Sequence, residues 1–353
     1  MRPCRRPSPC RPEPPSSHRP NRCAPPSTIL ALGALALCAA ACSGNDAHPN
    51  GPPGPTAAAP PPTAAASTAA AQPTTTTAAA ASTSADKPPI EASRCGQLDC
   101  WRFDTADQAF AYVLETSPAI LAIGESHARR GMEKIPSTTK RFTEQLLPKL
   151  PARTTDLILE LWMADGACGK QEQVVAKQQK QVTKNQAKSN TNEFVVLGHA
   201  AKARGMIPHV LRPSCDEYKH IAGAGPDAPL EMLTMITRLT ARKAKQLMEH
   251  RRNPKVGKPP FADPLLVAYG GGMHNDLRPQ ANREKWSFGP ELHQAVDGRY
   301  VELDLIVPEF IRAEPPWTAL PWYEHFDQQA APDKTTLLRQ SPGSYVLIFP
   351  RGS

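Results

Sequence analysis

The stretch Ala119-Ile120-Leu121-Ala122-Ile123-Gly124-Glu125-Ser126-His127 decides the fold of this chain. Its apolar first half predicts a strand covered on both faces, as in a parallel sheet. Gly124 permits a sharp exit from that strand, where a side chain would obstruct the chain. Glu125 and His127 stand two residues apart, so in extended chain their side chains share a face. Polar residues at the carboxyl end of a strand are typical of sites in open α/β sheets.

Apolar runs alternate with amphipathic segments throughout the chain after residue 90. This alternation predicts an α/β domain with a mostly parallel sheet flanked by helices, over residues 90–353. We expect strands over residues 119–123, 156–161, 206–211, 265–269, 300–307 and 345–349. We expect helices over residues 106–115, 138–147, 171–188, 193–203 and 230–250.

Two later strands also carry chemistry at or near their ends. Glu160 lies inside the apolar run Asp156-Leu157-Ile158-Leu159-Glu160-Leu161-Trp162. A carboxylate is costly there unless it is paired or binds a metal, and the alternative to a functional role is an ion pair with an arginine. The run from Leu265 to Tyr269 is followed by three glycines and then by His274. Consecutive glycines let the backbone pass close to another group, so His274 is a further candidate site residue.

The motifs Gly124-Glu-Ser-His127 and Gly271-Gly-Met-His274 share the form G-x-x-H, and each follows an apolar strand. Together with an intervening strand that carries a glutamate, they resemble the superfamily of Tiki/TraB proteins, ChaN-like haem-binding lipoproteins and erythromycin esterases. The resemblance covers residues 119–307, and the Gly-Glu-x-His form of the first motif is closer to the ChaN and esterase branches. One such fold hosts several chemistries, so the resemblance implies the fold more firmly than the activity.

The resemblance implies that Glu125, His127, Glu160 and His274 surround one pocket. In the Tiki-like case Glu125, His127 and His274 would bind a divalent metal, and imidazole and carboxylate suit Mn, Co, Fe or Zn. In the esterase-like case no metal is needed, and one histidine would activate water while a glutamate orients it. In the ChaN-like case Glu125, His127 and His274 would contact haem.

From these motifs we expect a hydrolase that cleaves an ester or amide bond in a small molecule or peptide with the assistance of a metal. The alternatives are a haem- or iron-binding uptake lipoprotein without turnover, and a noncatalytic scaffold of the envelope. Arg129 and Arg130 follow the first motif and would either clamp an anion or serve as surface charge. The Pro/Trp-rich residues 314–323 predict aromatic packing on the surface, with a lid as the alternative.

The N-terminus predicts export of the chain to the cell envelope. A basic segment precedes the apolar run of residues 28–41, which is too short for a membrane span and fits a signal peptide over residues 1–41. Small residues directly before Cys42 resemble a lipoprotein processing box, so we expect Cys42 to carry a lipid anchor in the outer membrane or at the cell surface. Ala39 replaces the usual leucine, which leaves ordinary cleavage and release of a soluble protein as the alternative. The Ala/Pro/Thr-rich residues 42–89 predict a disordered spacer.

The net charge of the chain indicates which classes of partner the domain can have. Six arginines and one acid lie in residues 1–41, so most of the net charge of +8 belongs to the leader. The rest of the chain is nearly balanced in charge, which gives no support for nucleic acid as a partner.

Four cysteines remain after residue 90, and an even number in an exported chain predicts disulfides. Three pairings of Cys95, Cys100, Cys168 and Cys215 are open.

Overall fold

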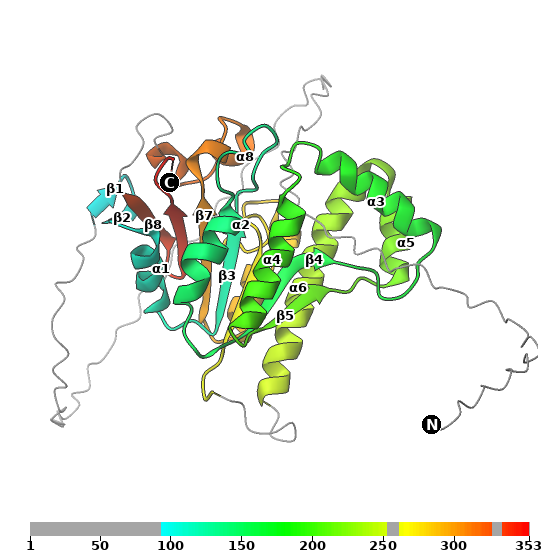
Figure 1. Cartoon of the computed structure of the whole chain (residues 1–353), viewed down its shortest axis with the longest axis horizontal. Helices are drawn as coiled ribbons and strands as arrows, with labels where there is room; N and C mark the ends of the chain where they lie inside the picture. The colour runs from blue at the N-terminus through cyan, green and yellow to red at the C-terminus, as the bar shows by residue number, and fades with distance from the viewer. Residues whose placement is uncertain (1–92, 253–260, 327–333, 353) are drawn as a thin grey trace, which may run out of the picture.

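The computed structural model describes residues 93–252, 261–326 and 334–352 (Figure 1). The predicted signal peptide, Cys42 and the spacer lie outside the described residues. Within these residues the strands form one sheet in the order β1-β2-β8-β9-β7-β3-β6-β4-β5. The strands are β1 (Ser93–Cys95), β2 (Leu98–Phe103), β3 (Ile120–Glu125), β4 (Thr154–Trp162), β5 (Ile207–Leu211), β6 (Leu265–Gly271), β7 (Tyr300–Ile306), β8 (Thr335–Ser341) and β9 (Ser344–Ile348).

The predicted fold class, α/β with a mostly parallel sheet, is confirmed. Strands β9, β7, β3, β6, β4 and β5 run parallel, with β3 hydrogen-bonded between β7 and β6. Strands β1, β2 and β8 extend the sheet as antiparallel neighbours, and no strand was predicted for them. Their sequences mix charged and apolar residues, such as LDCWRF in β2, so they lack the continuous apolar run by which the parallel strands were found.

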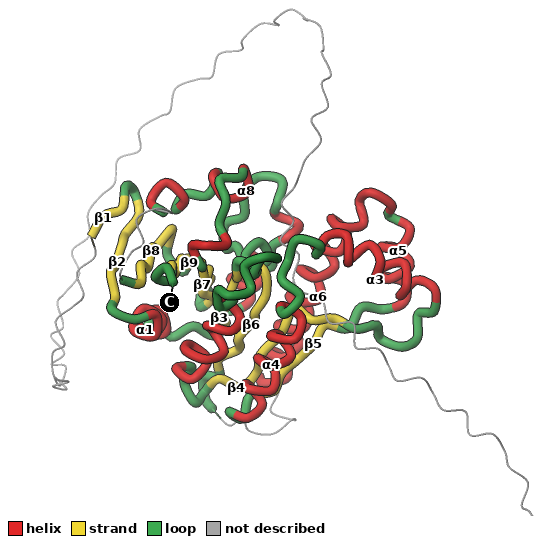
Figure 2. The backbone as a smooth tube through the Cα atoms, turned by 45° about the horizontal axis from the view of Figure 1, so that its top comes forward, coloured by secondary structure: helices red, strands yellow, loops and turns green. Residues whose placement is uncertain are grey.

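The helices cover both faces of this sheet. They are α1 (Ala106–Leu114), α2 (Thr138–Arg141), α3 (Lys170–Val182), α4 (Asn190–Ala203), α5 (Cys215–Gly223), α6 (Ala228–Arg252), α7 (Gly289–Ala295) and α8 (Pro315–Thr318). Figure 2 shows the sheet running from β1 and β2 at one end to β5 at the other, with α3 and α5 beyond β5. Of the helices within the described ranges, none is both long and apolar enough to cross a bilayer.

Several helices differ from the predictions: α3 ends at Val182, before the expected residue 188, and α7 and α8 were not predicted. The helix expected over residues 138–147 is α-helical only to Arg141, continues as a π-helical turn over Phe142–Leu146 and ends in a 3-10 turn at Leu147–Lys149. Pro148 lies in that last turn, and a proline cannot donate the backbone hydrogen bond of an α-helix. Helix α5 was not predicted either, although the pattern S-x-x-E at its start indicates a helix N-terminus. Ser214 and Glu217 form a capping box there.

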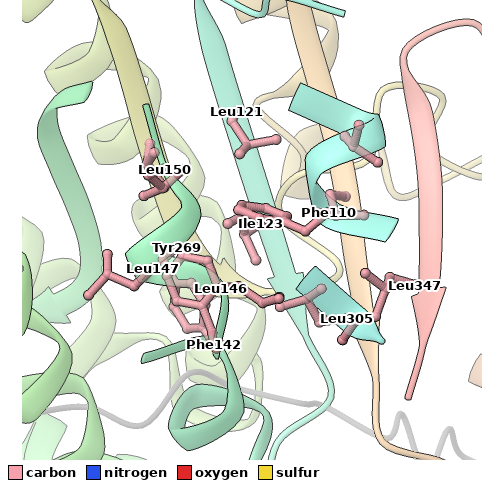
Figure 3. Close-up of a cluster of buried hydrophobic side chains, with 14 of the residues drawn as sticks. Phe110, Leu121, Ile123, Phe142, Leu146, Leu147, Leu150, Tyr269, Leu305 and Leu347 are labelled. Atoms are coloured by element: carbon pink, nitrogen blue, oxygen red, sulfur yellow. The ribbon is translucent and has the colours of Figure 1, made fainter. Parts of the chain in front are cut away.

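One face of the sheet packs against α1, the α2 segment and α4. Figure 3 shows this cluster, in which Leu121 and Ile123 of β3 and Tyr269 of β6 meet Phe110 and Phe142 of the covering helices. Burial of aromatic and branched side chains on this scale is the main source of stability for such a domain. Alternate residues of the same strands, including Ile120 and Ala122, face α6 and α7 on the other side. The central strands are therefore buried on both faces, as their apolar runs predicted.

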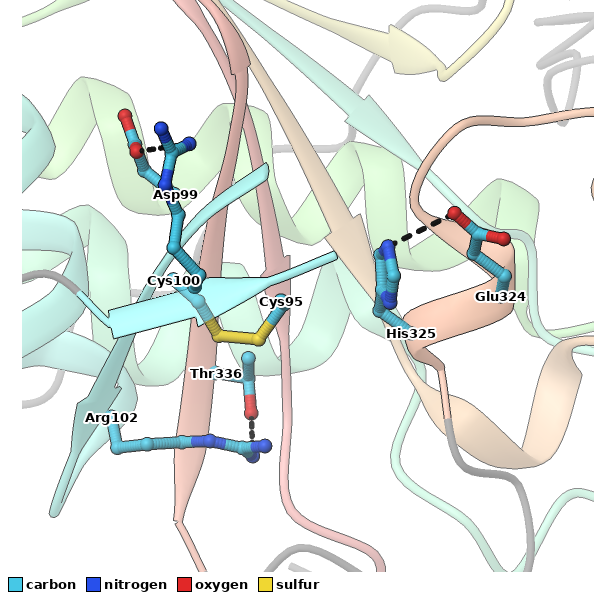
Figure 4. The surroundings of a disulfide bond; sticks show 8 residues. Cys95, Asp99, Cys100, Arg102, Glu324, His325 and Thr336 are labelled. Atoms are coloured by element: carbon cyan, nitrogen blue, oxygen red, sulfur yellow. Dashed lines mark hydrogen bonds and ion pairs between the residues drawn. A yellow bond between two sulfur atoms is a disulfide. The ribbon is translucent and has the colours of Figure 1, made fainter. Parts of the chain in front are cut away.

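Disulfides close the two ends of the domain, as the even number of cysteines predicted. Cys95 pairs with Cys100 across the β1–β2 hairpin (Figure 4). Cys168, in the loop after β4, pairs with Cys215 at the start of α5. Of the three open pairings the structure has this one. The second bridge links segments 47 residues apart, so it restricts the unfolded chain more than the first.

Candidate functional site

The polar candidates gather where the parallel strands β3, β6, β4 and β7 end. In register, Glu125 at the end of β3 lies beside Gly271 of β6 and Leu305 of β7. A pocket with a cavity volume of ≈ 80 Å³, which continues into space open to solvent, lies at this edge. It is lined by Gly124, Glu125, Ser126, His127, Gly271, Gly272, Met273, Asp276, Arg283, Asp304, Ile306, Pro316, Trp317 and Leu320. This is the position at which open α/β sheets bind ligands.

Glu125 and His127 form a buried pair, as their spacing predicted. His127 Nδ1 lies 2.5 Å from Glu125 Oε1, and both side chains are almost entirely buried. The other oxygen, Glu125 Oε2, accepts hydrogen bonds from Thr139 Oγ1 at 2.5 Å and from the Tyr269 hydroxyl at 2.6 Å. Glu125 is therefore an acceptor on both oxygens, and the Nδ1–H of His127 donates to it.

This arrangement leaves one ring nitrogen of His127 for chemistry. His127 Nε2 is buried and has no hydrogen-bond partner among the described residues. With the hydrogen held on Nδ1, the neutral ring carries a lone pair on Nε2. Burial and the neighbouring Glu125 raise the pKa of Tyr269 well above its usual value, so Tyr269 stays protonated and donates to Glu125. Glu125 thus fixes the tautomer and orientation of His127.

Glu160 and His274 form a second buried pair. Glu160 Oε1 lies 3.7 Å from His274 Nε2, and neither atom has a hydrogen-bond partner among the described residues. Glu160 Oε2 accepts from the Gly271 backbone N–H at 2.7 Å. On the other side of the ring, His274 Nδ1 lies 2.9 Å from the carbonyl of Trp286, which only accepts, so Nδ1 carries the hydrogen. In the part of the chain described, the partner of Glu160 is this histidine and not an arginine.

The two pairs lie on opposite faces of the sheet. Glu125 follows the alternation of Leu121 and Ile123, which pack toward the α2 side, and Thr139 of α2 contacts it. His274 Nδ1 lies 3.0 Å from Thr237 Oγ1 of α6, on the other side. Only the Glu125–His127 pair lines the pocket at the strand ends. The structure thus brings the four predicted residues together as two pairs on either side of Gly271.

Gly124 and Gly270 allow this close packing. A Cβ at Gly270 would lie 2.3 Å from Glu160 Oε2, so a bare backbone is needed for that carboxylate to reach Gly271. A Cβ at Gly124 would lie 2.3 Å from Asp304 Oδ1 and 2.6 Å from the backbone Cα of Gly272. Real Cβ atoms essentially never approach other heavy atoms so closely. Gly124 of the first motif and Gly270, directly before the second motif, are therefore required by contacts between strands as well as by the exit of the chain.

An acidic cluster that sequence reasoning missed lies on the face of the sheet opposite Glu125, and two of its three members line the pocket. Asp276, Glu302 and Asp304 place carboxylate oxygens within 4.8 Å of one another. Burial raises the pKa values of Asp276 and Glu302 well above their usual range, and the neighbouring Asp304 carboxylate adds to both shifts. Burial also raises the pKa of Asp304 to about 7, against a hydrogen bond from Asn275 that lowers it. The signal was present, because Glu302 and Asp304 interrupt the apolar strand β7 just as Glu160 interrupts β4.

The remaining sequence candidates lie at the margins of the pocket. Arg129 lines a neighbouring pocket together with His127 and Trp317, whereas Arg130 is exposed and lines neither of these two. In the Pro/Trp segment, Trp322 is fully buried and packs against Trp317 and Phe326, so the predicted aromatic packing is confirmed for Trp322. Trp317 is only partly buried and lines the pocket.

The metal ligands suggested by the resemblance do not converge in this structure. Both oxygens of Glu125 are occupied by hydrogen bonds, and His274 is turned toward α6 on the opposite face from Glu125. Among the described residues, Asp276, Glu302 and Asp304 are the group of three potential ligands that does converge. No family model, curated protein or solved structure matches the chain, so the superfamily resemblance remains a prediction from the motifs.

Proposed function

We propose that this domain hydrolyses an ester or amide bond, with His127 as the general base and Glu125 as the residue that positions it. The observation that carries the proposal is the buried Glu125–His127 pair, in which Nδ1 is committed and Nε2 is unpaired on a residue that lines a pocket. A histidine held in one tautomer by a buried carboxylate is the arrangement by which hydrolases activate a nucleophile.

In this mechanism His127 Nε2 takes a proton from a water molecule as the water oxygen attacks the substrate carbonyl carbon. The resulting imidazolium is stabilised by the buried Glu125 carboxylate, and the carbonyl oxygen becomes an oxyanion. When the bond to the leaving group breaks, Nε2 returns its proton to the departing oxygen or nitrogen. The products are a carboxylic acid and an alcohol or amine.

The pocket wall indicates how a substrate is held. Arg283 is the cationic side chain among its lining residues and would stabilise developing negative charge on the substrate. Met273, Ile306, Trp317 and Leu320 supply an apolar surface for the rest of the substrate. A mixture of an apolar wall and a few polar groups is typical of sites for small organic molecules.

The purified protein should therefore cleave an activated ester such as p-nitrophenyl acetate, and His127→Gln should lower kcat/KM by roughly 10²–10⁴-fold. Glu125→Gln should lower kcat by a similar factor with little change in KM, because it disturbs the tautomer of His127 and leaves the binding wall intact. His209 offers a matched control, since it is bonded to the buried carboxylate of Asp156 but lies outside the pocket. Full activity in His127→Gln, with His209→Gln as active as the parent, would exclude this mechanism.

A haem-binding role without turnover is the second candidate, and the free Nε2 of His127 beside an apolar wall favours it. His127 would then hold the haem iron through Nε2, and Trp317 and Met273 would supply apolar contacts to the haem. Titration with haemin would then give a Soret band that His127→Gln abolishes, in a protein without esterase activity. The esterase assay and the haemin titration, each carried out on the parent and on His127→Gln, therefore distinguish the hydrolase from the haem-binding protein.

We also propose that Cys42 is acylated and that residues 42–89 hold the domain away from an envelope membrane. The support is the signal-like apolar run followed by small residues and Cys42. Metabolic labelling with a radioactive fatty acid should mark the protein, and Cys42→Ser should lose the label. Absence of label in the parent would favour release as a soluble protein, and equal labelling of Cys42→Ser would place the acyl group on another residue.

A further inference from the structure

The acidic cluster at the edge of the pocket has the features of a cation site. Glu302 and Asp304 come from β7, and Asp276 follows the second G-x-x-H motif. We propose that Asp276, Glu302, Asp304 and the side-chain oxygen of Asn275 bind one divalent cation of the hard, oxygen-preferring class, Mg²⁺, Ca²⁺ or Mn²⁺. Carboxylate and amide oxygens are the ligands that these ions prefer.

The first argument is the balance of charge. Glu302 and Asp304 are 3% and 8% exposed, and none of the three carboxylates has an ion-pair partner within 4.0 Å in the described ranges. Several buried carboxylates that share one site are either protonated or neutralised by a cation. Elsewhere in the domain the buried Asp156 is paired with both Arg251 and His209. The carboxylates of the cluster therefore lack the cationic partners that this fold provides for the buried Asp156.

The second argument is the orientation of Asn275, which is independent of the carboxylates. Asn275 is 1% exposed, and its Nδ2 donates to Asp304 Oδ1 at 3.0 Å and to the Ala122 carbonyl at 3.3 Å. These two acceptors determine which end of the amide is nitrogen, so Oδ1 is the remaining end. Asn275 Oδ1 is buried and has no hydrogen-bond partner among the described residues.

That unpaired oxygen is directed toward the cluster. Asn275 Oδ1 and Asp304 Oδ1 lie 2.6 Å and 2.3 Å from the point that a Cβ on Gly124 would occupy, so the two oxygens lie near each other on the same side of β3. Gly124, Gly272, Asp276 and Asp304 also line the pocket, which offers a route for an ion from solvent. Arg283 attracts the Asp276 carboxylate but forms no ion pair with it, and Glu302 and Asp304 have no ion-pair partner in the described ranges. A single bound ion accounts for these carboxylates and for the buried amide oxygen without a donor.

Hydrogen bonds hold the backbone around the cluster in place and orient one of its carboxylates. Tyr300 donates its hydroxyl hydrogen to the Asn275 carbonyl at 2.6 Å, and Ser287 Oγ donates to the Asp276 carbonyl at 2.6 Å. The Leu277 N–H donates to Glu302 Oε2 at 2.6 Å, which orients that carboxylate. Such supporting hydrogen bonds are the usual means of preorganising metal ligands.

Binding of the cation can be measured directly, so this inference does not depend on the hydrolase proposal. The full chain would be treated with a chelator, desalted and titrated with MnCl₂, and free Mn²⁺ would be followed by electron paramagnetic resonance. We expect one saturable Mn²⁺ per chain, displaced by excess Ca²⁺ or Mg²⁺. Glu302→Gln and Asp304→Asn should abolish saturable binding, and Asn275→Ala should weaken it by roughly 10–100-fold, as loss of a supporting group commonly does.

Two controls separate this site from others. Asp165→Asn removes an exposed carboxylate outside the pocket and should leave Mn²⁺ binding unchanged. Mn²⁺ should also raise the melting temperature of the parent and of Asp165→Asn, but not that of Asp304→Asn, which confirms at the same time that this variant folds. No saturable binding by the parent would overturn the proposal. Binding that survives Asp304→Asn but is lost in His274→Ala would overturn it too, because the ion would then belong to the histidine pair.

Discussion

In metal-free protein, Asp304→Asn is expected to raise the free energy of unfolding near pH 8 by on the order of 4 kcal/mol and to change it little near pH 4. Burial raises the pKa of Asp304 from 3.8 to about 7, so the folded state holds this proton more tightly than the unfolded state does. The stability that the proton confers is fully present below about pH 4 and is lost as the pH rises through about 7. Asparagine keeps the contact with Asn275 and has no proton to lose.

Urea unfolding of parent and variant at the two pH values, in the presence of a chelator, would measure this difference. Asp165→Asn, at an exposed position, should show no dependence of its effect on pH. The same experiment on the parent alone should show stability falling from about pH 4 to about pH 7. A destabilised Asp304→Asn at pH 8, or an equal effect at both pH values, would contradict an uncompensated charge at Asp304.

The second large effect is expected at Gly124, where Gly124→Ala should lower the free energy of unfolding by roughly 3 kcal/mol. The added Cβ would lie 2.6 Å from Gly272 Cα, which is backbone and cannot rotate away. It would also meet Asp304 Oδ1 and Asn275 Oδ1, so β3 must separate from its neighbours to accommodate it. Strands that are buried on both faces cannot move apart to relieve such a contact without losing packing elsewhere in the core.

Gly223→Ala is the matched control for this substitution. Gly223 ends helix α5, and an added Cβ there would meet nothing within 4 Å. Its effect on stability should stay within about 0.5 kcal/mol, as for most surface substitutions. Chemical denaturation of both variants would decide the matter, since equal stabilities would show that the contact at Gly124 relaxes freely.

The sequence was most informative where one local pattern was sufficient. The central parallel strands were found because burial on both faces requires a continuous apolar run, which is visible without any knowledge of neighbours. Strands β1, β2 and β8 were missed because an antiparallel strand is defined by its partners as much as by its own residues. The helix α5 was missed through neglect of a capping signal and not through lack of one.

In the candidate site, too, local features were predicted and contacts between distant segments were not. The Glu125–His127 pair was predictable because two residues of one extended segment share a face whatever surrounds them. The acidic cluster brings Asp276 beside Glu302 and Asp304 from a different strand, and its signal in β7 needed only the argument already applied to Glu160. Glu160 and His274 face α6 and not the pocket. The sequence could not predict this, because it depends on which helix covers which side of the sheet.

The sequence by itself determined the α/β class, the central strands and the positions where polar groups end them, because alternation and apolar runs are properties of the chain. Only the tertiary structure decided the strand order, the disulfide pairing and the division of the four motif residues into two pairs on opposite faces. It alone brought Asp276, Glu302, Asp304 and Asn275 to one point. Contacts between segments distant in the sequence depend on packing of the whole sheet, which no single segment encodes.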